Sequence, residues 1–288
     1  MRVLLTGANG QLGRCFIDQL PEGWEILATE SKNLDITDSK SVMAVVTAFR
    51  PDVIVNAAAY TAVDLAENDT ETAKSVNIQG PLNLALAARN INCRLVHVST
   101  DYVFDGNCAI PYHENDMTNP LSVYGKTKLD GETAVMEIRP CSLIVRTAWV
   151  FSEYGNNFLK TMLRLAKDRD VLGVVSDQHG CPTYAGDIAV AIIELLQKDA
   201  EGGIYHYCGH QDISWSGFAE FIFSTALVRG ILVHAPQVKP ITTEEYPTVA
   251  KRPKYSLLNC GKINAIGIKS SDWQEKVNTV MLKMKDPA

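Results

Sequence analysis

The sequence of 288 residues lacks a run of basic residues, a long apolar stretch and a signal-peptide layout at its start. The net charge is −6 and the pI is near 5.6, so nucleic acid is not expected as a partner. A membrane is not expected as a partner either, because no apolar stretch reaches spanning length. These absences favour a cytoplasmic protein.

Cysteine and histidine are scattered rather than paired. The seven cysteines contain no Cys-x-x-Cys pair, and the six histidines have no spacing typical of metal ligands. The pattern favours free thiols in a reducing compartment over a disulfide framework or a metal cluster.

Short apolar runs alternate with helical patterns through the first half of the chain. Runs near residues 3–5, 26–28, 53–55, 95–98 and 143–145 are continuous, which is typical of strands buried on both faces of a parallel sheet. Repeated β-α units of this kind predict an α/β fold with a doubly wound, Rossmann-like parallel sheet.

The second half is less regular and predicts a smaller C-terminal α/β lobe. We expect residues 1–150 to form an NAD(P)-binding domain, to which segments of about 171–208 return. Residues 151–288 would then form mainly a substrate-binding lobe. Because no low-complexity linker is present, we expect this lobe to be built from interleaved segments.

A glycine triplet lies between the first predicted strand and the first predicted helix. Gly7 allows a tight turn, Gly10 lets backbone approach a pyrophosphate, and Gly13 lets helix and strand pack closely. The pyrophosphate would lie on the free N–H groups of the helix N-terminus.

Further residues are expected along the same cofactor site. Glu30 closes the second strand, where an acid accepts hydrogen bonds from the adenosine ribose and favours NADH, although a solvated loop glutamate is an equal alternative. Lys32 would soften the repulsion of an extra phosphate, so NADPH and NADH both stay open. The predicted cofactor residues are Gly7, Asn9, Gly10, Gln11, Leu12, Gly13, Glu30, Asp35, Ile36, Ala59, Tyr60, Thr61, Tyr124 and Lys128.

Tyr124 and Lys128 stand four residues apart, about twenty residues after Ser99-Thr100-Asp101. On a helix, positions i and i+4 share one face, so hydroxyl and ammonium can share a site. A phenol titrates near pH ~10, and a nearby cation is expected to lower its pKa so that it exchanges a proton near neutrality. Taken alone, the pair would be two surface residues of an amphipathic helix; beside the glycine triplet it predicts hydride chemistry at a carbonyl.

Longer strings resemble the dTDP-4-dehydrorhamnose reductase family of the extended short-chain dehydrogenase/reductases. They run nearly end to end and include Asn56-Ala57-Ala58-Ala59-Tyr60-Thr61-Ala62-Val63-Asp64, Ser99-Thr100-Asp101-Tyr102-Val103-Phe104-Asp105-Gly106, Tyr124-Gly125-Lys126-Thr127-Lys128-Leu129-Asp130-Gly131-Glu132, Arg146-Thr147-Ala148-Trp149-Val150, Gly155-Asn156-Asn157-Phe158 and Arg252-Pro253-Lys254-Tyr255-Ser256.

The resemblance implies reduction of the C4 ketone of dTDP-4-dehydro-L-rhamnose by NAD(P)H, giving dTDP-L-rhamnose. Tyr124 would donate the proton, Lys128 would lower the Tyr124 pKa and hold the nicotinamide ribose, and Thr100 would hydrogen-bond the same oxygen. If Thr100 does not reach the ketone, Ser99 is its substitute. The predicted substrate contacts are Thr61, Val63, Thr100, Asp101, Trp149, Asn157 and Arg252, of which Trp149 has an alternative as a core aromatic and Arg252 as a solvated side chain.

One departure from the family concerns metal. Some members hold Mg²⁺ between two subunits with acids after the third glycine and near a later Pro-Thr segment. Here Arg14 occupies the first position, and the later stretch offers Asp187 alone. We therefore predict no metal site, and a monomer or weak homodimer.

Two alternatives stay open. The regulatory β subunit of methionine adenosyltransferase has a similar Tyr-Gly-Lys-Thr-Lys string and binds nucleotide without catalysing this reaction. A nucleotide-sugar epimerase or dehydratase is the other, because Asp101 stands where dehydratases carry an acid.

Overall fold

The computed structural model describes residues 1–285, whose centre is a parallel six-stranded sheet. Its strands lie in the order β2-β1-β3-β4-β5-β10. Their bounds are β1 (Arg2–Thr6), β2 (Glu25–Thr29), β3 (Val53–Asn56), β4 (Arg94–Thr100), β5 (Leu143–Thr147) and β10 (Gly203–His206). The chain passes from β1 to β2 on one side and then to β3 on the other, which creates a topological switch point between β1 and β3.

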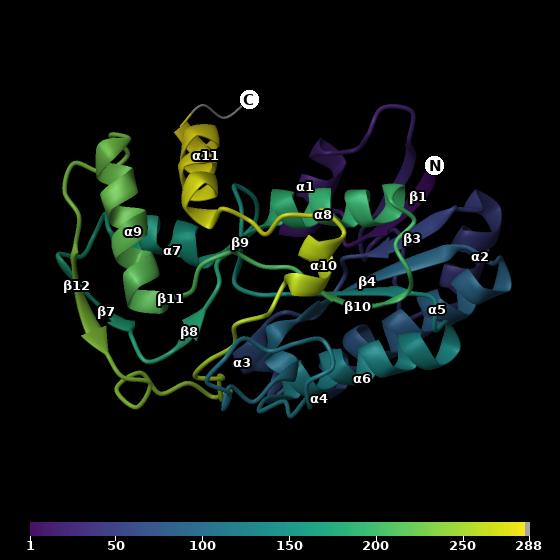
Figure 1. The fold of residues 1–288 in the computed structure, drawn as a ribbon, viewed down its shortest axis with the longest axis horizontal. Helices are drawn as coiled ribbons and strands as arrows, with labels where there is room; N and C mark the ends of the chain where they lie inside the picture. The colour runs from purple at the N-terminus through teal and green to yellow at the C-terminus, as the bar shows by residue number, and fades with distance from the viewer. Residues whose placement is uncertain (286–288) are drawn as a thin grey trace.

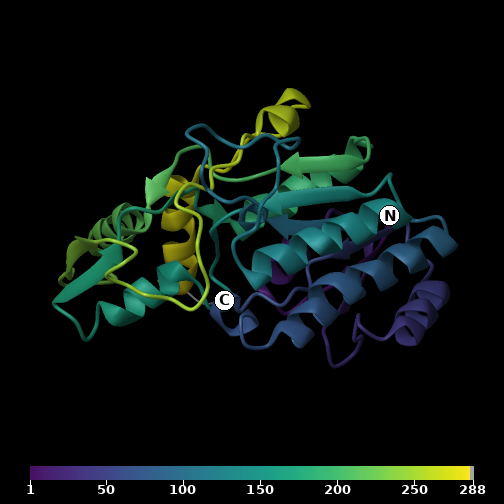
Figure 2. The same ribbon diagram turned by 90° about the horizontal axis from the view of Figure 1, so that it is seen from below.

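Helices cover both faces of this sheet (Figures 1 and 2). One face carries α1 (Gln11–Asp18) and α8 (Ala185–Gln197), and the other carries α2 (Ser39–Phe49), α5 (Gly80–Asn90) and α6 (Val123–Ile138). Successive strand residues point to opposite faces of the sheet. Val3 and Leu5 belong to the core under α8, and Leu4 belongs to the core under α2 and α5. The predicted doubly wound fold is therefore confirmed, and the strands are continuous apolar runs because both of their faces are buried.

A second core forms the smaller lobe at the left of Figure 1. Its helices are α7 (Phe158–Leu165), α9 (Trp215–Val228) and α11 (Trp273–Lys285). Two pairs of short strands are parallel: β7 (Val171–Val175) with β12 (Gln237–Ile241), and β6 (Val150–Phe151) with β9 (Thr183–Tyr184). A third pair, β8 (His179–Gly180) with β11 (Ile213–Ser214), is antiparallel. The short helix α10 (Gly261–Ala265) lies against β10.

Residues 171–208 divide between the two parts of the molecule. Their first strand, β7, pairs with β12 in the smaller lobe, whereas α8 and β10 belong to the large sheet and its cover. None of the described helices is long and apolar enough to cross a membrane.

The helix α6 docks unusually closely on the segment before α5. That segment comprises α3 (Val63–Ala66), α4 (Thr70–Lys74) and the π-helical turn η1 (Ser75–Gln79). A Cβ at Gly131 would lie 2.1 Å from the Asn77 carbonyl oxygen. The Asn77 amide donates to Thr127 Oγ1 at 3.1 Å, so α6 is hydrogen-bonded to this turn as well as packed on it.

We predict that Gly131→Ala destabilises the protein, because the added methyl group forces α6 away from η1. The expected loss is about 1–3 kcal/mol of unfolding free energy, measured by denaturant or thermal unfolding. The control is Thr133→Ala on the exposed side of the same helix, which should stay within about 0.5 kcal/mol of the parent. Equal stability of the two variants would contradict the close docking.

Candidate active site

A cleft of about 740 Å³ opens at the carboxyl ends of the strands, at the switch point. It is lined by Gly7, Asn9, Gly10, Gln11 and Leu12 after β1, by Glu30, Ser31, Leu34, Asp35 and Ile36 after β2, by Ala57, Ala58, Ala59, Tyr60, Thr61 and Val76, by Val98 and Ser99 of β4, by Tyr124 and Lys128 of α6, and by Thr147, Val150, Gly155 and Asn156. Of the residues predicted to bind cofactor, all but Gly13 line it.

The glycine turn shapes the cleft wall beneath the helix α1. Gly7 has a φ of +74°, and a Cβ there would lie 2.6 Å from the Ala58 backbone nitrogen. A Cβ at Gly13 would lie 2.2 Å from the Gly7 carbonyl oxygen, so Gly13 permits close packing of α1 on the turn rather than lining the cleft. The N-terminal amides of α1 therefore face a space that suits a diphosphate, because unpaired N–H groups and the helix dipole attract anions.

The Tyr124–Lys128 pair of α6 lines the same cleft. The Lys128 side chain is 2% exposed and its Nζ donates to the Val98 carbonyl at 2.7 Å. Tyr124 is half-buried, packs edge-on against Tyr102 with 5.7 Å between ring centroids, and shares a hydrogen bond with Thr100. The helix begins where Ser122 Oγ accepts from the Gly125 N–H at 3.1 Å, which sets the direction in which this pair points.

Burial dominates the titration of this pair. It raises the pKa of Tyr124 to about 12, helped by the Asp101 charge and opposed by the bond with Thr100. It lowers the pKa of Lys128 to about 8, opposed by the Glu132 carboxylate. The sequence-based expectation that Lys128 lowers the Tyr124 pKa is therefore wrong for the protein alone, because the phenol is desolvated and the ammonium bonds to a backbone carbonyl.

Thr100 and Asp101 form the neighbouring polar group at the end of β4. Thr100 Oγ1 donates to Asp101 Oδ1 at 3.0 Å and accepts from the Tyr102 N–H at 3.2 Å. Burial raises the pKa of Asp101 to about 6, opposed by hydrogen bonds with Ser256 and Thr100. Asp101 is 2% exposed, so this carboxyl group lies inside the protein behind the end of β4.

Arg252, predicted to contact substrate, lies instead against a second cavity of about 550 Å³. Its Nη2 and Nη1 donate to Asp64 Oδ2 at 2.6 Å and Asp64 Oδ1 at 3.1 Å. Asp64 also lines this cavity, together with Trp215 and Arg169. The bidentate pair ties the smaller lobe to α3, so Arg252 is not a solvated side chain.

Trp149 and Asn157 have defined partners between the two parts of the molecule. Trp149 has a φ of +46° and stacks on Trp215, with 3.4 Å between ring centroids and 5° between planes. Asn157 caps α7 by accepting from the Lys160 N–H at 3.1 Å, and it donates to Gln11 Oε1 at 2.9 Å. Neither lines the 740 Å³ cleft, and Val63 does not either.

Arg14 and Asp187, at the two positions where some relatives carry metal-binding acids, each contact other side chains. The Arg14 guanidinium lies 5.4 Å from the centre of the Tyr154 ring. Asp187 Oδ2 accepts from Ser271 Oγ at 2.7 Å, and Asp187 Oδ1 lies 3.5 Å from Lys276 Nζ. Within residues 1–285, no group of three or more His, Cys, Asp and Glu side chains is placed to hold a metal ion.

Several cleft residues were not predicted from the sequence. They are Ser31, Leu34, Val76, Val98, Thr147, Val150, Gly155 and Asn156. Thr147, Val150, Gly155 and Asn156 belong to strings that marked the family resemblance, which could have identified them. Ser31, Leu34, Val76 and Val98 carry no such signal, and only the fold brings them to the cleft.

A doubly wound sheet with a glycine-walled cleft ending at a Tyr-x-x-x-Lys helix defines the extended short-chain dehydrogenase/reductase class. Within that class, the family model described as "RmlD substrate binding domain" matches residues 1–285. The dTDP-4-dehydrorhamnose reductase of Aggregatibacter actinomycetemcomitans is 49% identical over 287 residues, covering 97% of this chain and 98% of the relative. The chain belongs to the dTDP-4-dehydrorhamnose reductase family and is an oxidoreductase.

Solved structures agree with this placement. A dTDP-4-dehydrorhamnose reductase from Clostridium acetobutylicum is 41% identical with a TM-score of 0.93, covering 99% of this chain and 100% of that one. The enzyme of that name from Bacillus anthracis, solved in complex with NADP, is 39% identical with a TM-score of 0.93, covering 98% of this chain and 99% of that one. The resemblance drawn from the sequence strings is confirmed.

Proposed function

We propose that this protein reduces the C4 ketone of dTDP-4-dehydro-L-rhamnose to dTDP-L-rhamnose, using NADPH or NADH. The observation that carries the proposal is the convergence of Tyr124, Lys128 and the Thr100 segment at one end of a cleft whose other end is a glycine turn. The family relation supplies the substrate class.

We further propose that residues 1–150, with the segment through α8 and β10, hold the dinucleotide, and that residues 151–288 otherwise form the substrate lobe. The cleft suits such a cofactor, because the glycine turn and the start of α1, Glu30 and Lys128 all line it. When bound, the dinucleotide supplies the hydride for C4.

Tyr124 acts as the proton donor. A pKa raised to about 12 keeps the phenol protonated across neutral pH, which suits reduction, where an alkoxide develops and must receive a proton. Lys128 supplies positive charge beside the developing oxygen and a hydrogen-bond donor for the nicotinamide ribose. Thr100 orients the phenol, since its hydroxyl is within bonding reach of Tyr124. It polarises the carbonyl when its proton turns from Asp101 Oδ1 to the substrate oxygen.

The remaining site roles are proposals of the same kind. The sugar of the substrate is contacted by Thr61, Val63, Asp101 and Trp149. Arg252 contacts the diphosphate of the nucleotide sugar from the 550 Å³ cavity. Asn157 acts through Gln11, to which it is hydrogen-bonded. Glu30 faces the adenosine ribose of the cofactor. Its ion pair with Lys32 lowers its repulsion of the extra phosphate that NADPH carries on this ribose, so the site accommodates both NADH and NADPH.

The surroundings of the enzyme are inferred from composition. We propose a cytoplasmic monomer or weak homodimer that needs no Mg²⁺ and binds neither nucleic acid nor membranes. The acidic net charge of −6 and seven free cysteines support this.

Turnover tests the function directly. The purified protein should oxidise NADPH or NADH only when dTDP-4-dehydro-L-rhamnose is added, and dTDP-L-rhamnose should accumulate in equal amount. Binding of both ligands without turnover would support the regulatory-subunit alternative instead.

We predict that Tyr124→Phe lowers kcat by about 10²- to 10⁴-fold while NADPH affinity stays near the parent value, because only the proton-donating oxygen is removed. Steady-state kinetics and cofactor fluorescence titration measure the two effects. Tyr154→Phe is the control, since its hydroxyl bonds to Asp18 outside the cleft. An unchanged kcat in Tyr124→Phe would rule out the assigned acid.

We predict that kcat/KM for reduction falls on the alkaline side, with a midpoint near the Lys128 pKa of about 8. Below that pH the ammonium is charged and the site is active; above it the charge is lost. The control is Lys126→Met on the exposed side of α6, which should leave the profile unchanged. A rate that stays level well above this pH would show that the Lys128 charge is not needed.

A further inference from the structure

We propose that Glu132 and Arg146, an ion pair buried beneath α6, are positioning residues that keep the Lys128 ammonium charged and in place. The proposal rests on the proposed function, in which Lys128 must carry its proton. Glu132 and Arg146 line neither the 740 Å³ cleft nor the 550 Å³ cavity.

Three polar side chains follow one another along a single stripe of α6. Tyr124, Lys128 and Glu132 are spaced by four residues, which places them on one helix face. Tyr124 opens onto the cleft, whereas Lys128 is 2% exposed and Glu132 is 3% exposed. The stripe therefore passes from the reacting end into the protein interior.

Arg146 of β5 holds both oxygens of Glu132. Its Nε donates to Oε1 at 3.0 Å and Oε2 at 3.2 Å, and its Nη2 donates to Oε2 at 2.7 Å. The strand β5 pairs with β4, whose Val98 carbonyl accepts from Lys128 Nζ at 2.7 Å. The same two strands thus fix Lys128 directly and Glu132 through Arg146.

The ionisable groups around Lys128 differ in their effect on its pKa. Glu132 and Tyr124 share its helix, His97 faces it from β4, Asp101 follows that strand, and Arg146 lies behind Glu132 on β5. Glu132 is the group whose charge raises the pKa of Lys128 against burial. The pKa of His97 is held well below its ordinary range by burial and by Lys128, so this imidazole is neutral.

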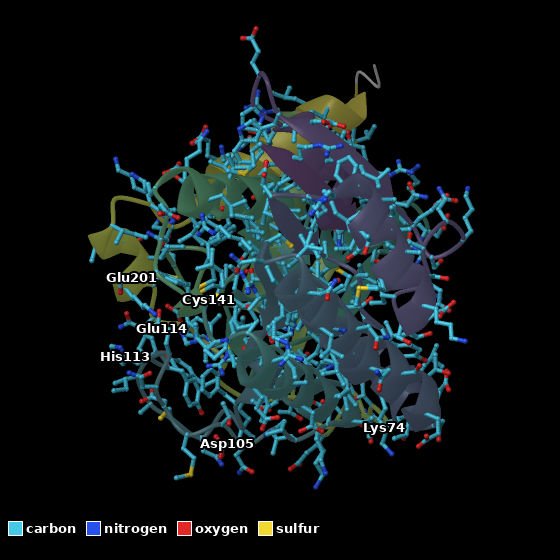
Figure 3. The ribbon with its side chains drawn as sticks, turned by 90° about the vertical axis from the view of Figure 1, so that its right-hand side faces the viewer. Lys74, Asp105, His113, Glu114, Cys141 and Glu201 are labelled. Atoms are coloured by element: carbon cyan, nitrogen blue, oxygen red, sulfur yellow. The ribbon has the colours of Figure 1, made fainter. Side chains whose placement is uncertain are left out.

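Arg146 is buried as well, and the carboxylate with which it forms an ion pair is that of Glu132. Its guanidinium lies 5.2 Å from the centre of the Phe104 ring, and Nη1 is 3.4 Å from both the Glu114 carbonyl oxygen and His206 Nε2. Burial and the Arg146 charge lower the pKa of His206 to about 3, so it adds no charge. Glu114 lies beside His113 at the edge of the molecule (Figure 3), and its side chain accepts from the His206 N–H.

A buried pair of this kind is weak support for stability, because desolvation of both charges offsets their attraction. An apolar pair would fill the same space. What an apolar pair would not supply is a fixed negative charge one helical turn from Lys128, and this is the role assigned here.

The test is Glu132→Gln, which keeps the shape and removes the charge. The alkaline limb of kcat/KM should move to lower pH by about one unit, which is a tenfold loss above the limb and little change well below it. The pH dependence of NADPH affinity, measured by cofactor fluorescence without any sugar, should move in the same direction. If the parent binds NADPH but does not reduce the sugar, the proposed function fails while this second readout still tests the pair.

Two further variants separate positioning from folding. Glu132→Gln with Arg146→Leu leaves no unpaired buried cation, so it should be better folded than Glu132→Gln. Its limb should still lie at lower pH than that of the parent, by a smaller shift because a nearby cation is lost as well. Val135→Ala, a buried position of the same helix, should lower Tm without moving either limb. Unmoved limbs in both Glu132 variants, or an equal shift in Val135→Ala, would overturn the proposal.

Discussion

The close docking of α6 on the turn after β4 and on η1 is the constraint on which the rest of the site depends. Two glycines allow it: a Cβ at Gly125 would lie 2.2 Å from the Tyr102 carbonyl oxygen, and one at Gly131 would lie 2.1 Å from the Asn77 carbonyl oxygen. Only at this separation can Lys128 reach the Val98 carbonyl and remain buried. The helix therefore places the Tyr124 phenol and the Lys128 ammonium in the cleft wall, and both side chains have little conformational freedom to lose when ligands bind.

In the proposed reaction, desolvation favours proton donation by Tyr124. A phenol whose pKa is raised to about 12 is a proton donor at neutral pH, and a lysine whose pKa is lowered to about 8 is close to losing its charge. The first effect suits reduction of a ketone; the second makes the compensating Glu132 carboxylate important. A site built only for binding a nucleotide would have no need of a desolvated acid beside the end of the cleft.

Much of this could be predicted from the sequence, because the signals are local. The glycine turn, the buried parallel strands and the Tyr124–Lys128 spacing each depend on neighbours within a few residues. The pKa of Tyr124 could not be predicted in the right direction, since burial depends on the whole fold. The Asp64–Arg252 pair joins residues 188 apart in the chain, and the Asn77 bond to Thr127 joins residues 50 apart. No local pattern marks either of them.

The most direct test of the account is the fate of hydrogen from the nicotinamide. With NADPH deuterated on its transferable position and dTDP-4-dehydro-L-rhamnose, the protein should yield dTDP-L-rhamnose carrying deuterium on C4, with one NADPH consumed per product. Deuterium absent from C4, or a sugar changed without net oxidation of the cofactor, would contradict a reductase and point to epimerase or dehydratase chemistry at the same cleft.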